Sequence, residues 1–264
     1  MIRVTRSVIP NLFTVMNLFS GFVAVKAAMV DSDFVAAGWF IVLGAIFDTL
    51  DGLMARLTHS ASEFGVELDS LADVVTFGVG PSAILYKLFF YQYGGLGLLL
   101  SAAPAMCGAL RLARFNVQLV GFDKDYFKGL PIPSSALLIV SYVTWYHLHQ
   151  NPNIPPETYT IAMFVIVIGA SLLMVSTIKY DSIPKFTGEA IKAHPVKFFG
   201  FLLILVIVIV TKGSAIFPFF VLFILFGVVR SIFDRTSRAV RQKRAAGFLD
   251  EEELEAEEAD TFGI

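Results

Sequence analysis

Residues 35–57 read VAAGWFIVLGAIFDTLDGLMARL. The run is long enough to cross a bilayer as a helix, which takes about 20 mostly apolar residues. Its charged side chains, Asp48, Asp51 and Arg56, all lie in the second half. A charge inside a membrane costs about 3 kcal/mol or more and persists mainly where it has a function. The stretch therefore predicts a transmembrane helix that carries functional groups near its carboxyl end.

The composition of the whole chain points to the same environment. Of the 264 residues, 56% are hydrophobic and 16% are charged, whereas soluble domains have about 45–50% apolar and about 25% charged residues. One globular core cannot bury so much apolar surface, so a bilayer must act as its solvent. The single cysteine, Cys107, excludes a disulfide within the chain and argues against a cysteine metal site.

A scan for apolar stretches of spanning length gives eight candidate transmembrane helices. They cover approximately Leu12–Val30, Val35–Leu57, Val66–Phe90, Gly95–Phe115, Pro133–His149, Tyr159–Thr177, Val196–Thr211 and Ser214–Ile232. Only Lys212 and Gly213 separate the last two, which favours a tight helical hairpin. We therefore predict an all-α integral membrane protein with about eight transmembrane helices; six or seven would require a merged or missed helix.

The basic residues predict the orientation. All but three of the 20 Lys and Arg residues fall on one side of the predicted spans, the exceptions being Lys26, Lys87 and Lys212. Because basic loops stay in the cytoplasm, we expect a multi-pass protein of the inner (cytoplasmic) membrane. Both termini and the charged ends of the second and third spans should face the cytoplasm.

Composition also divides the chain. Residues 234–264, after the last predicted span, are expected to form a cytoplasmic tail. Residues 230–244 are basic and residues 250–260 are strongly acidic. The acidic part is typical of a disordered, solvated tail. The basic part is expected to anchor the chain, with binding of anionic lipid headgroups as the alternative.

Four aspartates are the candidate functional groups. Asp48 and Asp51 are three residues apart, and Asp69 and Asp73 are four apart. On helices, both spacings place the pair on one face, so the four carboxylates are expected to converge. A divalent cation would offset their repulsion, and hard carboxylate oxygens select Mg²⁺, Mn²⁺ or Ca²⁺.

The residues between the aspartates suggest a phosphate ligand. Gly52 lets a bulky group approach the backbone, and Arg56 can clamp a phosphate. A single aspartate here could simply be a helix end that reaches headgroup water. A cation transporter is a further alternative, but its acids usually lie near the midplane on several separate spans, whereas these cluster at one face.

This pattern resembles the signature of the CDP-alcohol phosphotransferase family at every fixed position. The matching residues are Asp48-x2-Asp51-Gly52-x2-Ala55-Arg56-x8-Gly65-x3-Asp69-x3-Asp73. The resemblance implies a membrane core of about six spans, which would be residues 1–178, with a transmembrane hairpin of the last two spans, residues 179–233, as an addition. It also implies Asp48, Asp51 and Asp69 as metal ligands, and Asp73 as both a ligand and the general base.

The same resemblance suggests residues that contact the CDP-linked lipid. Gly52 and Arg56 would bind the CDP group. Ser62 falls where the family can place a hydroxyl against the nucleotide. Asn11 and Thr14 begin the first span, which lines the cytidine pocket in the family.

Three further stretches, Leu71–Ser82, Arg111–Asn116 and Phe127–Ala136, resemble membrane-embedded phosphatidylserine synthases. This implies transfer of a phosphatidyl group from CDP-diacylglycerol to L-serine, with Mg²⁺ or Mn²⁺, in what is commonly a homodimer. Other alcohols, such as glycerol-3-phosphate, inositol phosphate or choline, are the alternatives.

A serine acceptor needs partners for its carboxylate and its ammonium. Candidate residues for the acceptor site are Arg111, Arg114, Asn116 and Lys128. A guanidinium holds a carboxylate through two hydrogen bonds, although both arginines could instead be positive-inside anchors. Lys128 could hold the lipid phosphate or cap its loop.

Overall fold

The structure is a computed structural model. It describes residues 8–58, 60, 62–119, 126–149, 151–181, 207–208 and 210–233. The chain divides into two units, residues 1–222 and 223–264. All contacts discussed below lie within the first unit.

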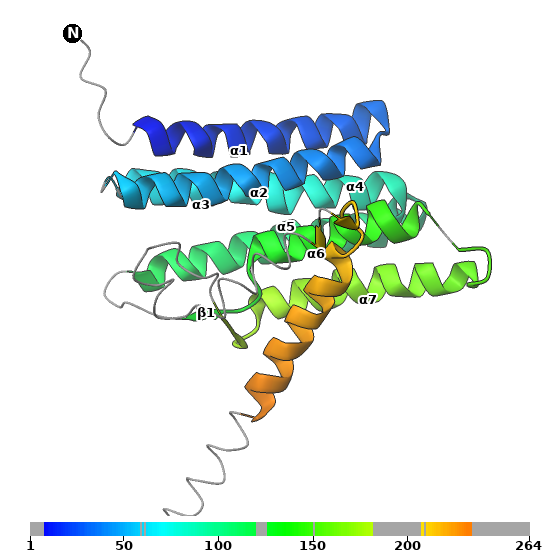
Figure 1. Ribbon diagram of the computed structural model, residues 1–264. Coiled ribbons are helices and arrows are strands. Elements are labelled where there is room, and N and C mark those ends of the chain that lie inside the picture. Colours follow the sequence, from blue (N-terminus) through cyan, green and yellow to red (C-terminus); the bar gives the residue numbers. More distant parts are fainter. Residues whose placement is uncertain are drawn as a thin grey trace, which may run out of the picture. The chain divides into compact units, whose positions relative to one another are not determined.

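Helices account for nearly all of the described structure (Figure 1). In chain order the elements are α1 (Val8–Lys26), η1 (Ala27–Asp31), α2 (Phe34–Leu57), α3 (Glu63–Asp73), η2 (Val74–Val79), α4 (Gly80–Leu88), η3 (Phe90–Tyr93), α5 (Gly94–Leu119), β1 (Tyr126–Lys128), α6 (Ile132–Tyr142), η4 (Val143–His147), α7 (Pro156–Val175) and β2 (Lys179–Asp181). A further helix covers Ile216–Phe233. Of the η segments, η1, η2 and η4 are π-helical turns continuous with α-helices, and η3 is a 3₁₀-helix.

Among the described residues, six helices are long and apolar enough to span a membrane. They cover Val8–Asp31, Phe34–Leu57, Glu63–Leu88, Phe90–Val117, Pro156–Val175 and Ile216–Phe233. The prediction of an all-α membrane protein is confirmed. The predicted fifth span is the shorter helix α6–η4, and most of the predicted seventh span, residues 196–211, lies outside the described residues.

The third span, formed by α3, η2 and α4, is the most buried of the six. It contacts α1, α2, α5 and α6, and Figure 1 shows α1 and α2 side by side along their lengths. The third span is therefore the centre of the bundle. Any polar group on its inner face is shielded by neighbouring helices.

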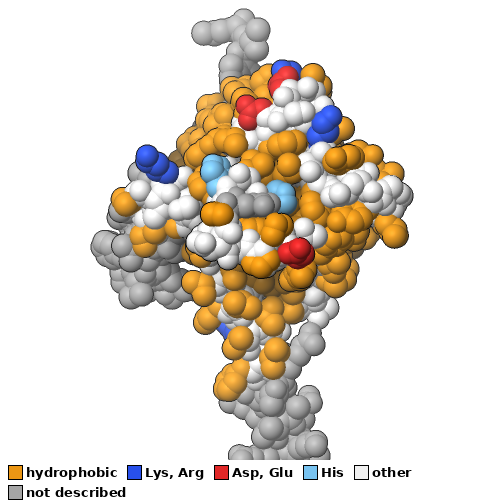
Figure 2. All heavy atoms as spheres, turned by 90° about the vertical axis from the view of Figure 1, so that its right-hand side faces the viewer, with side chains coloured by type: hydrophobic (Ala, Val, Ile, Leu, Met, Phe, Trp, Pro, Cys, Tyr) orange, Lys and Arg blue, Asp and Glu red, His pale blue; other side chains and the backbone are white. Residues whose placement is uncertain are grey.

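Figure 2 views the end of the molecule where α1 gives way to α2. Charged side chains are scattered over this face among many hydrophobic ones. The segment where α1 continues into η1 carries an exposed ion pair between Lys26 and Asp31, with 2.6 Å between Nζ and Oδ2. Asp48 and Asp51 lie towards the other end of α2, near its carboxyl terminus.

A small antiparallel pair of strands joins two distant segments outside the spans. Tyr126, Phe127 and Lys128 of β1 pair with Asp181, Tyr180 and Lys179 of β2, respectively. The Tyr180 side chain is only 1% exposed. Burial raises the pKa of its phenol to about 12, so this group is neutral at physiological pH.

The helices α1, α2 and η2 approach closely at two glycines. A Cβ atom at Gly21 would lie 2.7 Å from the Cα atom of Thr76, and one at Gly44 would lie 2.5 Å from the Thr76 Cγ2 atom. Neither position leaves room for a side chain. Thr76 therefore packs directly against the backbones of the first two spans.

We expect Gly21→Ala to destabilise the protein by about 1–3 kcal/mol, because the added methyl group overpacks a backbone contact. The measurement is the melting temperature in detergent. Gly169→Ala in α7 is the matched control, since a Cβ atom there meets nothing within 4 Å. It should match or exceed the wild type, because alanine favours a helix by about 1 kcal/mol. Equal melting of Gly21→Ala and the wild type would contradict the close approach.

Candidate metal and substrate site

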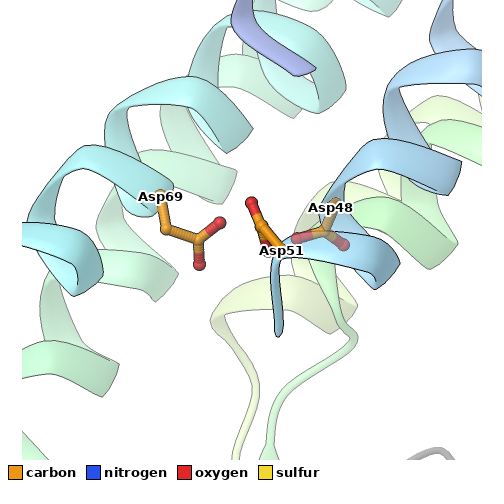
Figure 3. Close-up of side chains that lie close together, drawn as sticks. All are labelled: Asp48, Asp51 and Asp69. Atoms are coloured by element: carbon orange, nitrogen blue, oxygen red, sulfur yellow. The ribbon is translucent and has the colours of Figure 1, made fainter. Parts of the chain in front are cut away.

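Three carboxylates meet between α2 and α3. One oxygen from each of Asp48, Asp51 and Asp69 lies within 4.8 Å of the other two. Figure 3 shows Asp69 reaching from α3 towards Asp48 and Asp51, which come from successive turns of α2. Asp51 is buried and the other two are half-buried. The predicted convergence is therefore present for these three residues.

Asp73 lies one turn beyond Asp69 and does not belong to this group of three. Its carboxyl group is 6% exposed and interacts electrostatically with Asp48, Asp51 and Asp69. Oδ1 of Asp73 accepts a hydrogen bond of 3.3 Å from Nδ2 of Asn17. All four acids thus share one electrostatic environment, and among the described residues an amide side chain holds only Asp73.

The first helix also contacts Asp51. Thr14 Oγ1 donates to Asp51 Oδ2 at 2.8 Å and also lies 3.2 Å from its own helix carbonyl at Pro10. The resemblance suggested that Thr14 lines the cytidine pocket; in the structure its hydroxyl is hydrogen-bonded to the carboxylate of Asp51. Asn11 lies at the start of α1, and its Oδ1 would be 3.6 Å from a Cβ atom at Gly65.

Ser62 orients the helix that carries Asp69. It precedes α3, and its Oγ accepts a 3.1 Å hydrogen bond from the Gly65 N–H. Such a cap satisfies a backbone donor that has no partner inside the helix. Nucleotide contact by Ser62 stays a prediction, whereas the capping role is visible. The sequence held this signal, because a serine opens the apolar run of the third span.

Gly52 and Arg56 lie on α2 next to the three clustered carboxylates. A Cβ atom at Gly52 would meet nothing within 4 Å, so the helix surface beside Asp51 faces open space. Arg56, one turn further on, is exposed. The geometry leaves room for a ligand next to the acids.

The candidate acceptor residues separate into different environments. Arg111 is 6% exposed, and its guanidinium is attracted electrostatically to Asp73. Arg114 instead donates to the carbonyl groups at the end of α7, reaching Val175 O at 2.9 Å and Ser176 O at 3.2 Å. The sequence did not predict this structural role of Arg114.

Asn116 contacts α3. Its Nδ2 donates to Ser70 Oγ at 2.9 Å and lies 3.5 Å from Glu67 Oε1. The side chain of Lys128 lies outside the described residues. Arg111 is therefore the candidate acceptor residue that the described structure ties to Asp73.

The three clustered carboxylates are chemically suited to bind a divalent cation. Their ligand atoms are all hard carboxylate oxygens, which Mg²⁺ and Mn²⁺ prefer. Asp69 Oδ1 is buried and has no hydrogen-bond partner within the part of the chain that the structure describes. Such an oxygen is costly unless it gains a partner, and a cation would provide one.

Comparison with known proteins agrees with this geometry. The family model for CDP-alcohol phosphatidyltransferase matches residues 7–175, which contain all four aspartates. The chain belongs to this family. The resemblance noted in the sequence is thereby confirmed.

Relatives within the CDP-alcohol phosphatidyltransferase family include bacterial and archaeal proteins. The CDP-diacylglycerol–serine O-phosphatidyltransferase of Helicobacter pylori is 39% identical over 227 residues, covering 85% of this chain and 91% of the relative. The protein of the same name from Bacillus subtilis is 33% identical, covering 70% and 96%. The archaetidylserine synthase of Methanothermobacter thermautotrophicus is 35% identical, covering 66% and 70%.

We expect Asp69→Asn to change stability and metal affinity in opposite directions. Removing one of several repelling carboxylates should raise the melting temperature of the metal-free protein. The same change should weaken Mn²⁺ binding at least about tenfold, because a ligand is lost. The measurements are thermal unfolding and Mn²⁺ titration in detergent.

Glu67→Gln is the matched control for Asp69→Asn. It removes an exposed carboxylate from the same helix, outside the group of three. It should leave Mn²⁺ affinity unchanged. Equal effects of the two substitutions would contradict a metal site at the three aspartates.

Proposed function

We propose that the protein transfers a phosphatidyl group from CDP-diacylglycerol to the hydroxyl of L-serine, giving phosphatidylserine and CMP. The observation that carries the proposal is the cluster of three carboxylates, Asp48, Asp51 and Asp69, beside the open surface at Gly52. The names of relatives from bacteria and archaea support serine as the acceptor. A donor with ether-linked chains fits the site equally well, because the proposed contacts involve only the CDP group and the phosphates.

The proposed cofactor is Mg²⁺ or Mn²⁺, held by Asp48, Asp51, Asp69 and Asp73. When bound, the ion would neutralise charge on the pyrophosphate and on the CMP leaving group. The aspartates would keep the ion beside Gly52, where the absence of a side chain lets the pyrophosphate approach the helix. Arg56 would contact the CDP group from the exposed end of α2.

Asp73 is the proposed general base. It would take the proton from the serine hydroxyl as the serine oxygen bonds to the β-phosphorus. The bond from that phosphorus to the oxygen shared with CMP would break, and CMP would leave with its electron pair. The buried position of Asp73 would exclude water, which would otherwise compete with serine as the nucleophile.

Arg111 is the proposed partner of the serine carboxylate. A buried guanidinium beside the base would bring the carboxylate and the hydroxyl of one small molecule to neighbouring points. Arg114 would act indirectly by fixing the end of α7. Asn116 and Lys128 stay candidates for contact with the ammonium group and the lipid phosphate.

The setting of the reaction is also a proposal. The site would open to the cytoplasm, since most basic residues lie on that side of the predicted spans. Residues 1–178 would form the catalytic core of a homodimer, with residues 179–233 as an additional hairpin and residues 234–264 as the tail. An acceptor other than serine is the nearest alternative, and a cation transporter is the alternative from another class.

A CMP-release assay on the purified protein tests the reaction. With CDP-diacylglycerol and Mn²⁺, release should require L-serine and stop when EDTA removes the metal. Asp73→Asn should lower kcat by about 10²–10⁴-fold, the usual contribution of a general base. Release with glycerol-3-phosphate instead of serine would replace the acceptor. No release with any acceptor from folded protein would overturn the transferase and favour the transporter.

Gly52→Ala tests the contact with the CDP group. The added methyl group meets no protein atom within 4 Å, so the melting temperature should match or exceed the wild type. The same methyl group would fill space that the donor needs, so KM for CDP-diacylglycerol should rise at least about tenfold, a loss of roughly 1.4 kcal/mol. Gly169→Ala in α7, where the added methyl group also meets no protein atom within 4 Å, should leave KM unchanged. An unchanged KM in Gly52→Ala would place the donor elsewhere.

A further inference from the structure

Asn17 is a fully buried amide in the middle of the first span. Its side chain is 0% exposed, and its Nδ2 lies 3.3 Å from Asp73 Oδ1. The NH₂ group of the amide is the donor in this contact and therefore faces Asp73, the orientation that the ionised form of Asp73 requires, because a carboxylate can only accept hydrogen bonds. This fixes the orientation of the amide and directs its oxygen away from Asp73.

The amide oxygen has no donor in the part of the chain that the structure describes. Oδ1 of Asn17 is buried and without a hydrogen-bond partner among the described residues. It faces α2 at Gly44, where a Cβ atom would lie 2.9 Å from it. A buried acceptor left without a donor destabilises the folded state, and leucine has the same branched arrangement of heavy atoms without that cost. The contact of Nδ2 with Asp73 is the feature that distinguishes asparagine from leucine here.

The backbone of Asn17 is held by the same helix that carries Asp73. Thr76 Oγ1 donates to the Asn17 carbonyl oxygen at 2.9 Å, and Thr76 lies three residues after Asp73. Thr76 is itself fixed by the close approach of Gly21 and Gly44. Asn17 is therefore attached to the third span at two points, and its amide has little freedom to turn.

We propose that Asn17 is a positioning residue for Asp73. By occupying Oδ1, it leaves Oδ2 as the oxygen that takes the proton of the acceptor hydroxyl while the new phosphorus–oxygen bond forms and CMP departs. The inference rests on the proposed function for the chemical step. The contact between Asn17 and Asp73 exists independently of which alcohol is the acceptor.

The first helix makes a related contact one turn earlier. Thr14 Oγ1 holds Oδ2 of Asp51 at 2.8 Å, and Thr14 and Asn17 are three residues apart on one face of α1. The hydroxyl contacts a member of the group of three carboxylates, whereas the amide contacts Asp73. The face of α1 thus orients one aspartate from each of the two motif helices.

Asn17→Leu is the decisive variant, because it keeps the number and branching of the side-chain heavy atoms and replaces both polar atoms by methyl groups. We expect kcat for CMP release to fall about 10–100-fold, the usual effect of losing a partner that orients a ligand or catalytic group. KM for CDP-diacylglycerol and for serine should stay within about threefold. The melting temperature should match or exceed the wild type, since an unpartnered buried oxygen is removed. Ser20→Ala is the control, because the Ser20 hydroxyl, on the same face of α1, bonds only to its own helix at Met16 O among the described residues.

A double-mutant cycle with Asp73→Asn provides a readout besides activity. In the wild-type background, Asn17→Leu should raise the dissociation constant for Mn²⁺ about tenfold, because Asp73 loses its orientation. In the Asp73→Asn background, the same change should leave the Mn²⁺ affinity unaltered. Coupling of this kind identifies an effect transmitted through Asp73.

Each possible result of these experiments either supports or overturns the proposal. A Leu variant with unchanged kcat overturns the inference, as does an equal loss of Mn²⁺ affinity in both backgrounds. Parallel losses of melting temperature, KM and kcat would indicate a packing role and also overturn it. If the wild type releases no CMP with any alcohol, the proposed function fails, and the Mn²⁺ cycle alone decides whether Asn17 positions Asp73.

Discussion

Four carboxylates close together inside a membrane protein are the constraint on which the rest of the structure depends. Each must be removed from water, and each repels the others. The fold brings two of them on α2 against two on the third span and surrounds them with α1 and α5. The acids thus lie where neighbouring helices shield them from water. Because their burial and mutual repulsion are unfavourable, a cation bound among them would stabilise the site.

Different helices around the acids orient different members of the group. Two donors on α1 contact Asp51 and Asp73, while Ser62 fixes the start of the helix that carries Asp69. Arg111 on α5 adds positive charge near Asp73, and Arg114, one turn on, ties α5 to the end of α7. Rigid elements therefore position each charged group, while the surface at Gly52 is left open for a ligand.

The sequence was sufficient for the spans and for the aspartate motif, because long apolar runs and spacings of three and four residues have few structural interpretations. It was insufficient for Asn17, since a single amide in an apolar run can bond to many partners and its partner lies 56 residues away. It also could not separate Arg111 from Arg114. Three residues apart on one helix, they meet different neighbours, and only the position of α7 decides which one bonds to its carbonyl groups.

The π-helical turn η2, immediately after Asp73, has a consequence for how this segment can vary. A π-helical turn contains an additional residue compared with an α-helical turn, so it rotates everything beyond it by about 100° relative to everything before it. The face of the span that carries Asp69 and Asp73 is therefore rotated relative to the face that carries Ser82 and Leu85. The number of residues between the two halves of the span sets the angle between their faces. Deletion of a single residue from residues 74–79 would therefore turn the acids away from the donors on α1, or turn the packing face of α4 away from its neighbours.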